Sequence, residues 1–151
     1  MIRELKQEDL DRCGDILADC LMWDKYQRTL SDAVNLMHHE FNSGTRFWVY
    51  VEGETVVGFI GAIEGGMMGE FTYIRMLAVE KNHRGNGIGT ALLGRAEEEM
   101  FALCPVIYMM VSDFNVDAQR LYDRLGYIKV GVIPDYKKKG IDEHLLLKRK
   151  S

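Results

Sequence analysis

Apolar residues recur at helical spacing in the first third of this chain of 151 residues. From Gln7 to Met22 they recur every three or four positions, which predicts one amphipathic helix with a single apolar stripe. The stripe consists of Leu10, Cys13, Ile16, Leu17, Cys20 and Leu21. A second helix is predicted to begin at Ser31-Asp32, which suits an N-cap, and to stop at Asn42-Ser43-Gly44.

The rest of the chain alternates between strand-like and helix-like segments. Aromatic and β-branched residues predict strands, and turn signals such as Glu52-Gly53-Glu54 and the glycines between 65 and 69 separate them. The predicted strands are 2–5, 46–51, 55–63, 71–79, 106–111, 127–133 and 143–148, with helices at 88–103 and 115–125. No repeat or linker interrupts this order, so the prediction is one domain over residues 1–151.

The most informative segment is Arg84-Gly85-Asn86-Gly87-Ile88-Gly89-Thr90, between the strand that ends in Leu77-Ala78-Val79 and the next helix. Glycines let a ligand approach the backbone closely. The free amide groups at the start of a helix, together with the helix dipole, favour negative charge. Arg84 adds a fixed positive charge. The segment therefore predicts a cradle for a pyrophosphate group.

Three kinds of phosphate loop compete for this segment. A nucleoside triphosphatase loop requires Lys-Ser or Lys-Thr after its glycines, and neither is present. A dinucleotide fingerprint requires a third glycine where Thr90 stands, directly after a strand, whereas residues 80–83 separate strand and loop here. The third pattern, R-x-x-G-x-G, is satisfied by Arg84, Gly87 and Gly89.

That pattern resembles the coenzyme A loop of the GNAT superfamily of N-acetyltransferases. A second segment, Asn115-x-x-Ala118-x-x-x-Tyr122-x-x-x-Gly126-Tyr127, resembles another motif of the superfamily, with Tyr127 in place of the common Phe. The resemblance covers essentially the whole chain. It implies an α/β fold of the acyl-CoA N-acyltransferase type, with a central mixed, mostly antiparallel sheet flanked by helices. It also implies acetyl transfer from acetyl-CoA, as co-substrate, to a primary amine.

The resemblance implies a role for each motif. Tyr122 would be the general acid that protonates the departing thiolate, and Ala118, four residues earlier on the same helix face, would let the cofactor pack closely. Asn115 would hold the pantetheine arm or cap the helix. Leu77, Ala78 and Val79 would bind the arm through their backbone groups. Residues 84–90, including Gly85, Asn86, Ile88 and Thr90, would hold the pyrophosphate.

The group that takes the proton of the amine is less clear from the sequence. Glu70 and Tyr73 are the candidates at the start of the strand 71–79. Some related amino-terminal acetyltransferases pair a tyrosine in the position of Tyr73 with a histidine, but Met110 stands in that place here and cannot relay a proton. His144, beside Asp142 and Glu143, and Tyr136 are further candidates for contact with the acceptor.

Composition limits the remaining possibilities. A net charge of −4 argues against a nucleic-acid partner. Cys13, Cys20 and Cys104 form no C-x-x-C pair, and the histidines lack metal-ligand spacing, so we expect a reduced, cytoplasmic protein without a metal. No apolar run is long enough to span a membrane. The acceptor would be a small molecule or a protein amino terminus, and a homodimer is possible. The alternative is a non-catalytic regulatory module that binds acyl-CoA.

Overall fold

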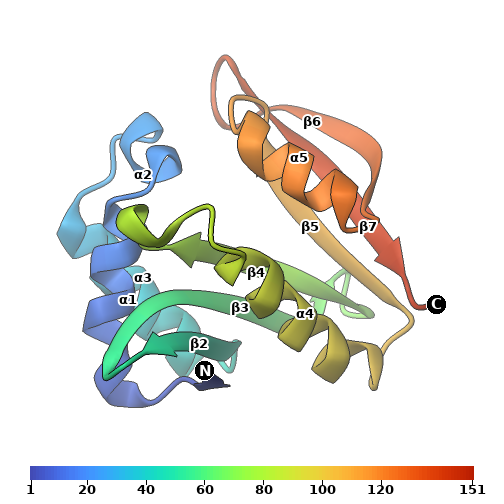
Figure 1. The fold of residues 1–151 in the computed structure, drawn as a ribbon. Helices are drawn as coiled ribbons and strands as arrows, with labels where there is room; N and C mark the ends of the chain where they lie inside the picture. Colours follow the sequence, from blue (N-terminus) through green and yellow to red (C-terminus); the bar gives the residue numbers. More distant parts are fainter.

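The computed structural model describes residues 1–151 and contains one seven-stranded sheet with helices on both faces (Figure 1). The strands lie in the order β1-β2-β3-β4-β5-β7-β6, and only the neighbours β4 and β5 are parallel. Their bounds are β1 Ile2–Glu4, β2 Arg46–Glu52, β3 Thr55–Met67, β4 Phe71–Val79, β5 Val106–Ser112, β6 Ile128–Lys138 and β7 Ile141–Arg149. The prediction of a mixed, mostly antiparallel sheet is confirmed.

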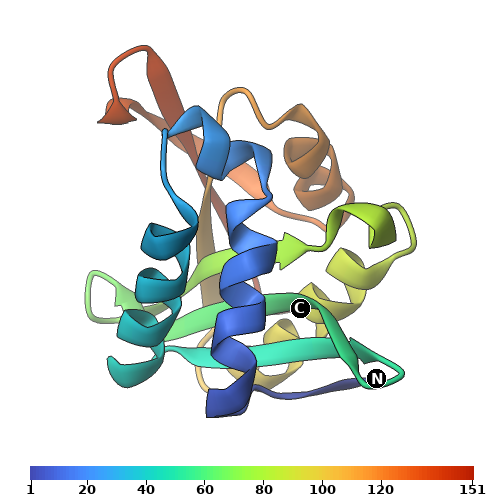
Figure 2. The same ribbon diagram turned by 90° about the vertical axis from the view of Figure 1, so that its left-hand side faces the viewer.

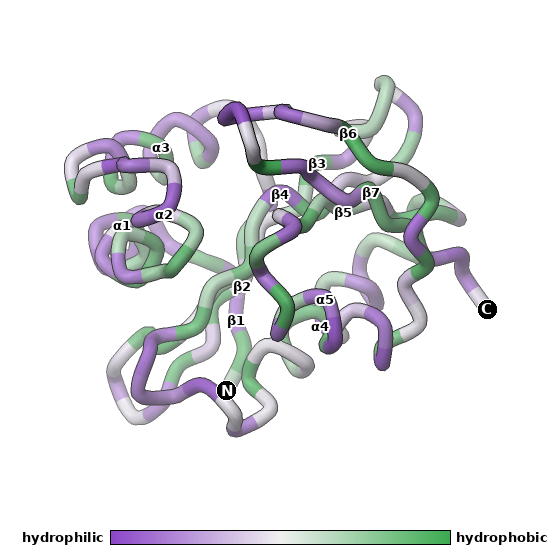
Figure 3. The backbone as a smooth tube through the Cα atoms, turned by 90° about the horizontal axis from the view of Figure 1, so that it is seen from above, coloured by the Kyte–Doolittle hydropathy of each residue, from purple (hydrophilic) through white to green (hydrophobic).

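Helices form one layer on each side of this sheet, and Figures 2 and 3 show the two layers from different directions. We call the face covered by α1 (Leu10–Ala18) and α3 (Leu30–Asn42) the front face. The back face is covered by α4 (Ile88–Phe101) and α5 (Val116–Arg124). A short helix, α2 (Leu21–Lys25), connects α1 with the segment before α3. Each face has its own apolar core.

Strands β4 and β5 pair over only three residues. The paired rows are Thr72 with Ile107, Tyr73 with Tyr108, and Ile74 with Met109. Beyond these rows the two strands have no pairing, and Figure 1 shows β5 turning away from β4. We call the region between residues 75–79 of β4 and 110–112 of β5 the β4–β5 divergence. In this region both strands continue while their pairing has ended.

The prediction of one helix from Gln7 to Met22 is wrong. A 3₁₀ turn (Gln7–Asp9) precedes α1, which ends at Ala18, and Cys20 takes an extended conformation with ψ 145° before α2 begins. The change of direction buries Trp23, whose indole N–H donates to Thr29 C=O at 2.7 Å. Leu21, a member of the predicted stripe, is 51% exposed as a result.

Two further boundaries differ from prediction for local reasons. Helix α3 begins earlier because Thr29, and not Ser31 or Asp32, is its N-cap; the Thr29 hydroxyl accepts from Asp32 N–H, and the Asp32 carboxylate accepts from Thr29 N–H. Strand β3 extends to Met67, so Gly65 and Gly66 lie within it. A Cβ on Gly66 would come within 2.9 Å of Tyr73 Cβ, which explains the glycine in a strand.

No helix in the structure combines the length and the apolar character needed to cross a membrane.

Candidate active site

Backbone groups of β4 are unpaired on the side that faces the β4–β5 divergence. The Glu80 N–H donates to Val57 C=O at 2.8 Å, which fixes residues 80, 78 and 76 as those that bond to β3. By alternation, the N–H and C=O groups of Leu77 and Val79 point towards β5, which has already turned away. The structure thus leaves the N–H and C=O of Leu77 and the N–H of Val79 without a strand partner, whereas the backbone of Ala78 pairs with Phe59.

The glycine loop takes a conformation that requires glycine at two positions. Gly85 has φ +80° and Gly87 has φ +79°, both in the left-handed region. Gly87 is the N-cap of α4 and makes no side-chain cap; the first helical bond runs from Ala91 N–H to Gly87 C=O. The amides of Ile88, Gly89 and Thr90 therefore have no acceptor within the helix and are available at its N-terminus.

The Arg84 side chain lies along the end of β4. Its Nε donates to the Val79 carbonyl at 3.0 Å, and its Nη2 lies 3.7 Å from the Cys20 Sγ atom. The guanidinium thus ties the loop to the strand and places a positive charge beside the free amides. Arg84 is exposed, so its charge is open to solvent and to an incoming anion.

The first turn of α4 also lies against α5. A Cβ on Gly89 would be 3.7 Å from Leu121 Cδ2 and 3.9 Å from Val79 Cγ2, so Gly89 sits where the two helices and β4 meet. Asn115 is the N-cap of α5, and its Oδ1 accepts from Ala118 N–H at 3.4 Å. Its capping function is thus present in the structure, and the Nδ2 donor remains for another partner.

Tyr122 lies in the back core, with Ala118, Leu77 and Val79 packed against the same core. Its hydroxyl has no hydrogen-bond partner, and burial raises the pKa of this phenol to about 12. The neighbouring Tyr127 differs, because its hydroxyl donates to Glu97 at 2.8 Å. The two rings are edge to face, 6.1 Å between centroids. Of these two tyrosines, only Tyr122 has a hydroxyl available for a ligand.

The candidates for proton transfer are separated along β4. Tyr73 lies in the row before the last β4–β5 pair, at the closed end of the divergence, and burial raises its pKa to about 12. Glu70 lies in the exposed turn before β4. Seven residues of strand, roughly 20 Å, separate Glu70 from Leu77. The structure therefore brings Tyr73 to the divergence and leaves Glu70 at the far end of the strand.

A polar group that the sequence did not single out lies on the front side of the divergence. The Tyr26 hydroxyl, at the end of α2, lies 3.0 Å from Ser112 Oγ and donates to Glu143 Oε2 at 3.1 Å. Ser112 and Glu143 face each other across β5 and β7. Ser112 and Glu143 lie 86 and 117 positions from Tyr26, so no local motif could have indicated these contacts.

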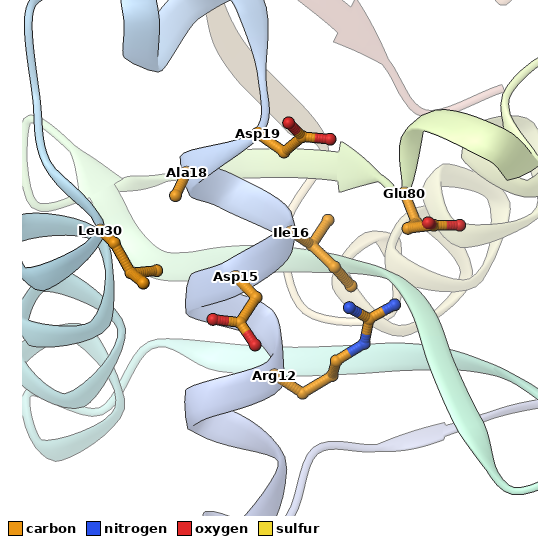
Figure 4. A pocket seen from close by; sticks show the side chains of 7 residues that line it. All are labelled: Arg12, Asp15, Ile16, Ala18, Asp19, Leu30 and Glu80. Carbon is orange, nitrogen blue, oxygen red and sulfur yellow. The ribbon is translucent and has the colours of Figure 1, made fainter.

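His144 lies on the opposite side of the sheet from Glu143. Side chains alternate along β7, and His144 lines a cavity of about 300 Å³ against α5 on the back face, together with Leu146 and Gln119. A further cavity, of about 360 Å³, lies beside α1 (Figure 4). It is lined by Arg12, Asp15, Ile16, Ala18, Asp19, Leu30 and Glu80. None of the site residues predicted from the motifs lines either cavity.

Comparison with known proteins identifies the family. The family model of the GNAT acetyltransferases matches residues 5–127, which include both the glycine loop and the Asn115–Tyr127 motif. The chain belongs to the GNAT acetyltransferase family. A curated relative, an uncharacterized N-acetyltransferase of Methanocaldococcus jannaschii, is 42% identical over 102 residues. That match spans 66% of this chain and 63% of the relative's length.

Solved structures of other N-acetyltransferases share the fold over nearly the whole chain. An aminoglycoside 6′-N-acetyltransferase in complex with coenzyme A has a TM-score of 0.81 at 22% identity, covering 99% of this chain and 96% of that one. Ribosomal-protein-alanine N-acetyltransferase from Brucella melitensis has a TM-score of 0.78 at 21% identity, covering 99% of both chains. At these identities the likeness shows a common fold, and the acceptors in these names belong to those proteins.

Proposed function

We propose that this protein transfers the acetyl group of acetyl-CoA to a primary amine by direct attack in a ternary complex. The observation that carries the proposal is the β4–β5 divergence, which connects the glycine loop and Tyr122 at the back with the Tyr26–Glu143 group at the front. A donor that enters from the back and an acceptor that enters from the front can meet only where the sheet is interrupted.

The pyrophosphate of the donor would be held by residues 84–90. The free amides of Ile88, Gly89 and Thr90 supply hydrogen-bond donors, and the dipole of α4 adds positive potential. Gly85, Asn86 and Gly87 bring the backbone close to the phosphates, and the charge of Arg84 completes the site. The backbone amides, the helix dipole and the guanidinium together suit the two negatively charged phosphates of a pyrophosphate.

The pantetheine arm would pair with β4 in place of the missing part of β5. The free N–H and C=O of Leu77 and the free N–H of Val79 match the amides of the arm, and Ala118 leaves room beside α5. The unpaired Nδ2 of Asn115 offers one further donor. A backbone N–H of this segment would also polarise the thioester carbonyl, and a single donor of that kind contributes about 3 kcal/mol to transition-state stabilisation.

In the chemical step, an ammonium first loses one proton to solvent, and its nitrogen then attacks the thioester carbonyl carbon. A C–N bond forms, the C–S bond breaks, and the second proton of the nitrogen leaves as the sulfur is protonated. Tyr122, whose raised pKa keeps its hydroxyl protonated throughout the physiological range, would give its proton to the departing sulfur and recover a proton from solvent as the thiol leaves. Tyr73 would guide the proton of the amine to solvent through a hydroxyl-bound water. Glu70 has no part in this proposal.

Thiol release from acetyl-CoA, measured with a panel of small amines and peptide amino termini, tests the function directly. Release that depends on an amine supports acetyl transfer and identifies the class of acceptor. A protein that binds coenzyme A by calorimetry but releases thiol with none of these amines would instead be the regulatory binding module. Failure to bind coenzyme A at all would contradict the assignment of residues 84–90.

A further inference from the structure

Glu143 is a buried carboxylate without an ion pair. Its residue is only 3% exposed, and its side chain receives one hydrogen bond, from the Tyr26 hydroxyl. None of the nine ion pairs of the protein includes it. A buried charge normally has a partner of opposite charge, because desolvation is otherwise costly. One phenol does not supply such a charge. Burial lowers the pKa of Lys137 and the nearby charge of Glu143 opposes that shift, yet the two side chains form no ion pair. Glu143 therefore has no cation in direct contact.

Two other buried carboxylates of the protein each have an ion-pair partner of the kind that Glu143 does not have. Asp9 binds Arg3 through both oxygens, at 2.8 and 3.1 Å, and Glu40 accepts from Arg75 at 3.1 Å and from Thr45 at 2.7 Å. Each of these two carboxylates thus forms an ion pair with an arginine on a β-strand, Arg3 on β1 and Arg75 on β4. Glu143 is thus the exception, and it lies in the row of Ser112, at the front edge of the divergence.

Two tyrosines lie near this carboxylate, and a third ring packs against one of them. The Tyr26 ring lies 6.2 Å from the Phe114 ring, and Lys137 Nζ lies 5.8 Å above the Tyr26 ring. Tyr73 faces the same group, and burial, followed by smaller effects that include the charge of Glu143, raises its pKa. Faces of aromatic rings attract ammonium groups, and a carboxylate strengthens that attraction. The Tyr26 ring already has the Lys137 ammonium above it, which shows that these surroundings accommodate an ammonium group.

A row of buried and half-buried apolar side chains continues from this point. Leu145 and Leu147 follow Glu143 on the same side of β7, and Met110 and Tyr108 lie opposite them on β5. The front core includes no residue of β5, β6 or β7, so the helix layer that covers β2–β4 stops before these strands. A ligand that places a charge at Glu143 would lay its remaining atoms along this row.

We infer that Glu143, positioned by the Tyr26 hydroxyl, binds the ammonium group of the acceptor, and that the acceptor is a primary amine carried on an apolar chain. The inference rests on the proposed transfer to an amine and names its substrate class. Glu143 holds the ammonium at the edge of the divergence until its nitrogen loses a proton to solvent. Tyr26 acts as a positioning residue, since its hydroxyl bridges Ser112 and Glu143.

Calorimetric titration of the full chain with hexylammonium, without acetyl-CoA, tests binding separately from chemistry. The neutral 1-hexanol has a similar shape and serves as the ligand control. We expect the ammonium to bind at least tenfold more tightly than the alcohol, and Glu143→Gln to remove that preference while 1-hexanol binding stays the same. Glu54→Gln makes the same charge change in an exposed turn and should leave both affinities unchanged.

Three results would overturn the inference. The first is equal binding of hexylammonium and 1-hexanol by the unchanged protein, which needs no variant and so does not depend on the folding of Glu143→Gln. The second is an ammonium preference that survives in Glu143→Gln. The third is hexylammonium binding that weakens as much in Glu54→Gln as in Glu143→Gln, which would point to an effect of net charge and not of this carboxylate.

Steady-state kinetics separate this inference from the proposed function. With hexylamine as acceptor, Glu143→Gln should raise the KM for the amine at least tenfold, with kcat and the KM for acetyl-CoA within threefold. Amine-dependent turnover with an unchanged KM in the variant would leave the function intact and overturn the inference. Ammonium-specific binding that depends on Glu143, without turnover, would uphold the cation site and count against the transferase.

Discussion

The two sides of the β4–β5 divergence are built by different means. At the back, the candidate donor site consists mainly of backbone: free amides at the start of α4, free groups of Leu77 and Val79, and glycines that leave them accessible. At the front, the candidate acceptor site consists of side chains from α2, β5 and β7, namely Tyr26, Ser112 and Glu143. Backbone recognition depends on conformation, whereas side-chain recognition depends on residue type.

This difference predicts how substitutions will act. At the back, a change matters when it alters the backbone conformation, the charge at the loop or the single free hydroxyl. At the front, a change in one side chain should alter the preference for acceptors and leave donor binding intact. The two sides can therefore be perturbed separately.

The largest expected effect is on turnover at the back. Tyr122→Phe should lower kcat at least about 100-fold, because general acid catalysis contributes 10²-fold or more, while the affinity for coenzyme A stays within about twofold. Stopped assays of thiol release and calorimetry measure the two quantities. Tyr127→Phe is the matched control: its hydroxyl binds Glu97, so this variant should lose about 1 kcal/mol of stability and keep its kcat. Equal turnover in Tyr122→Phe and the unchanged protein would refute the general-acid role.

Reversal of the charge at the loop should weaken donor binding next. Arg84→Glu should raise the Kd for coenzyme A about 30-fold, equivalent to roughly 2 kcal/mol for a charge-assisted phosphate contact. Arg120→Glu, on the exposed side of α5, makes the same charge change and should have little effect. Calorimetry at several salt concentrations would show a weaker salt dependence for Arg84→Glu than for the control. Equal losses in both variants would indicate a long-range effect of net charge.

A change of backbone conformation in the loop should weaken coenzyme A binding less than the charge reversal does. A matched pair of glycine variants separates this loss of binding from the loss of stability. Gly87→Ala and Gly126→Ala both place a Cβ on a residue with positive φ, at +79° and +92°, and each should cost about 1–2 kcal/mol of stability. Only Gly87→Ala disturbs the amides at the start of α4, so only this variant should also bind coenzyme A several-fold more weakly. Thermal unfolding and calorimetry provide the comparison. Similar donor affinity in the two variants would contradict the cradle.

The smallest effect concerns alkaline stability and involves both sides. The folded-state pKa values of Tyr122 and Tyr73 are raised to about 12, above the ordinary value of about 10 in the unfolded chain. The folded state then holds protons that the unfolded state has lost, so this stability is present below pH 10 and is lost as the pH rises through 12. Urea unfolding at pH 9 and pH 11 should show the loss. Tyr122→Phe should show a smaller loss than the unchanged protein, and an identical pH dependence would argue against the raised pKa.

The sequence predicted the helices and the loop of the back side because their determinants are local, whereas the roles of their residues stay predictions. The loop occupies seven consecutive residues, and Asn115, Ala118 and Tyr122 lie on one helix, so spacing alone indicates their arrangement. The fold class followed from the family resemblance that the same motifs carry, whereas the order of the strands within the sheet was not predicted. The orientation of Arg84 towards Val79 did not, because a flexible side chain has several acceptors within reach.

The front side could not be predicted, for two physical reasons. Tyr26 reaches Glu143 only because α1 ends at Ala18 and α2 takes a new direction, and the continuous apolar stripe concealed that break. In β7, one position decides which face a side chain takes, so the adjacent His144 and Glu143 point to opposite sides. Bulges in β6 shift the register further, between Lys129 and Gly131 and again after Ile133.

The central claim is that donor and acceptor enter from opposite faces and meet in the β4–β5 divergence. A crystal structure with a bisubstrate analogue, in which an acetyl linker joins the sulfur of coenzyme A to the nitrogen of hexylamine, tests it most directly. The account predicts pyrophosphate at residues 84–90, the linker between β4 and β5 beside Tyr122, and the hexyl chain on the front face near Glu143. An analogue bound with both ends on the back face, or with its hexyl chain away from β7, would contradict the account.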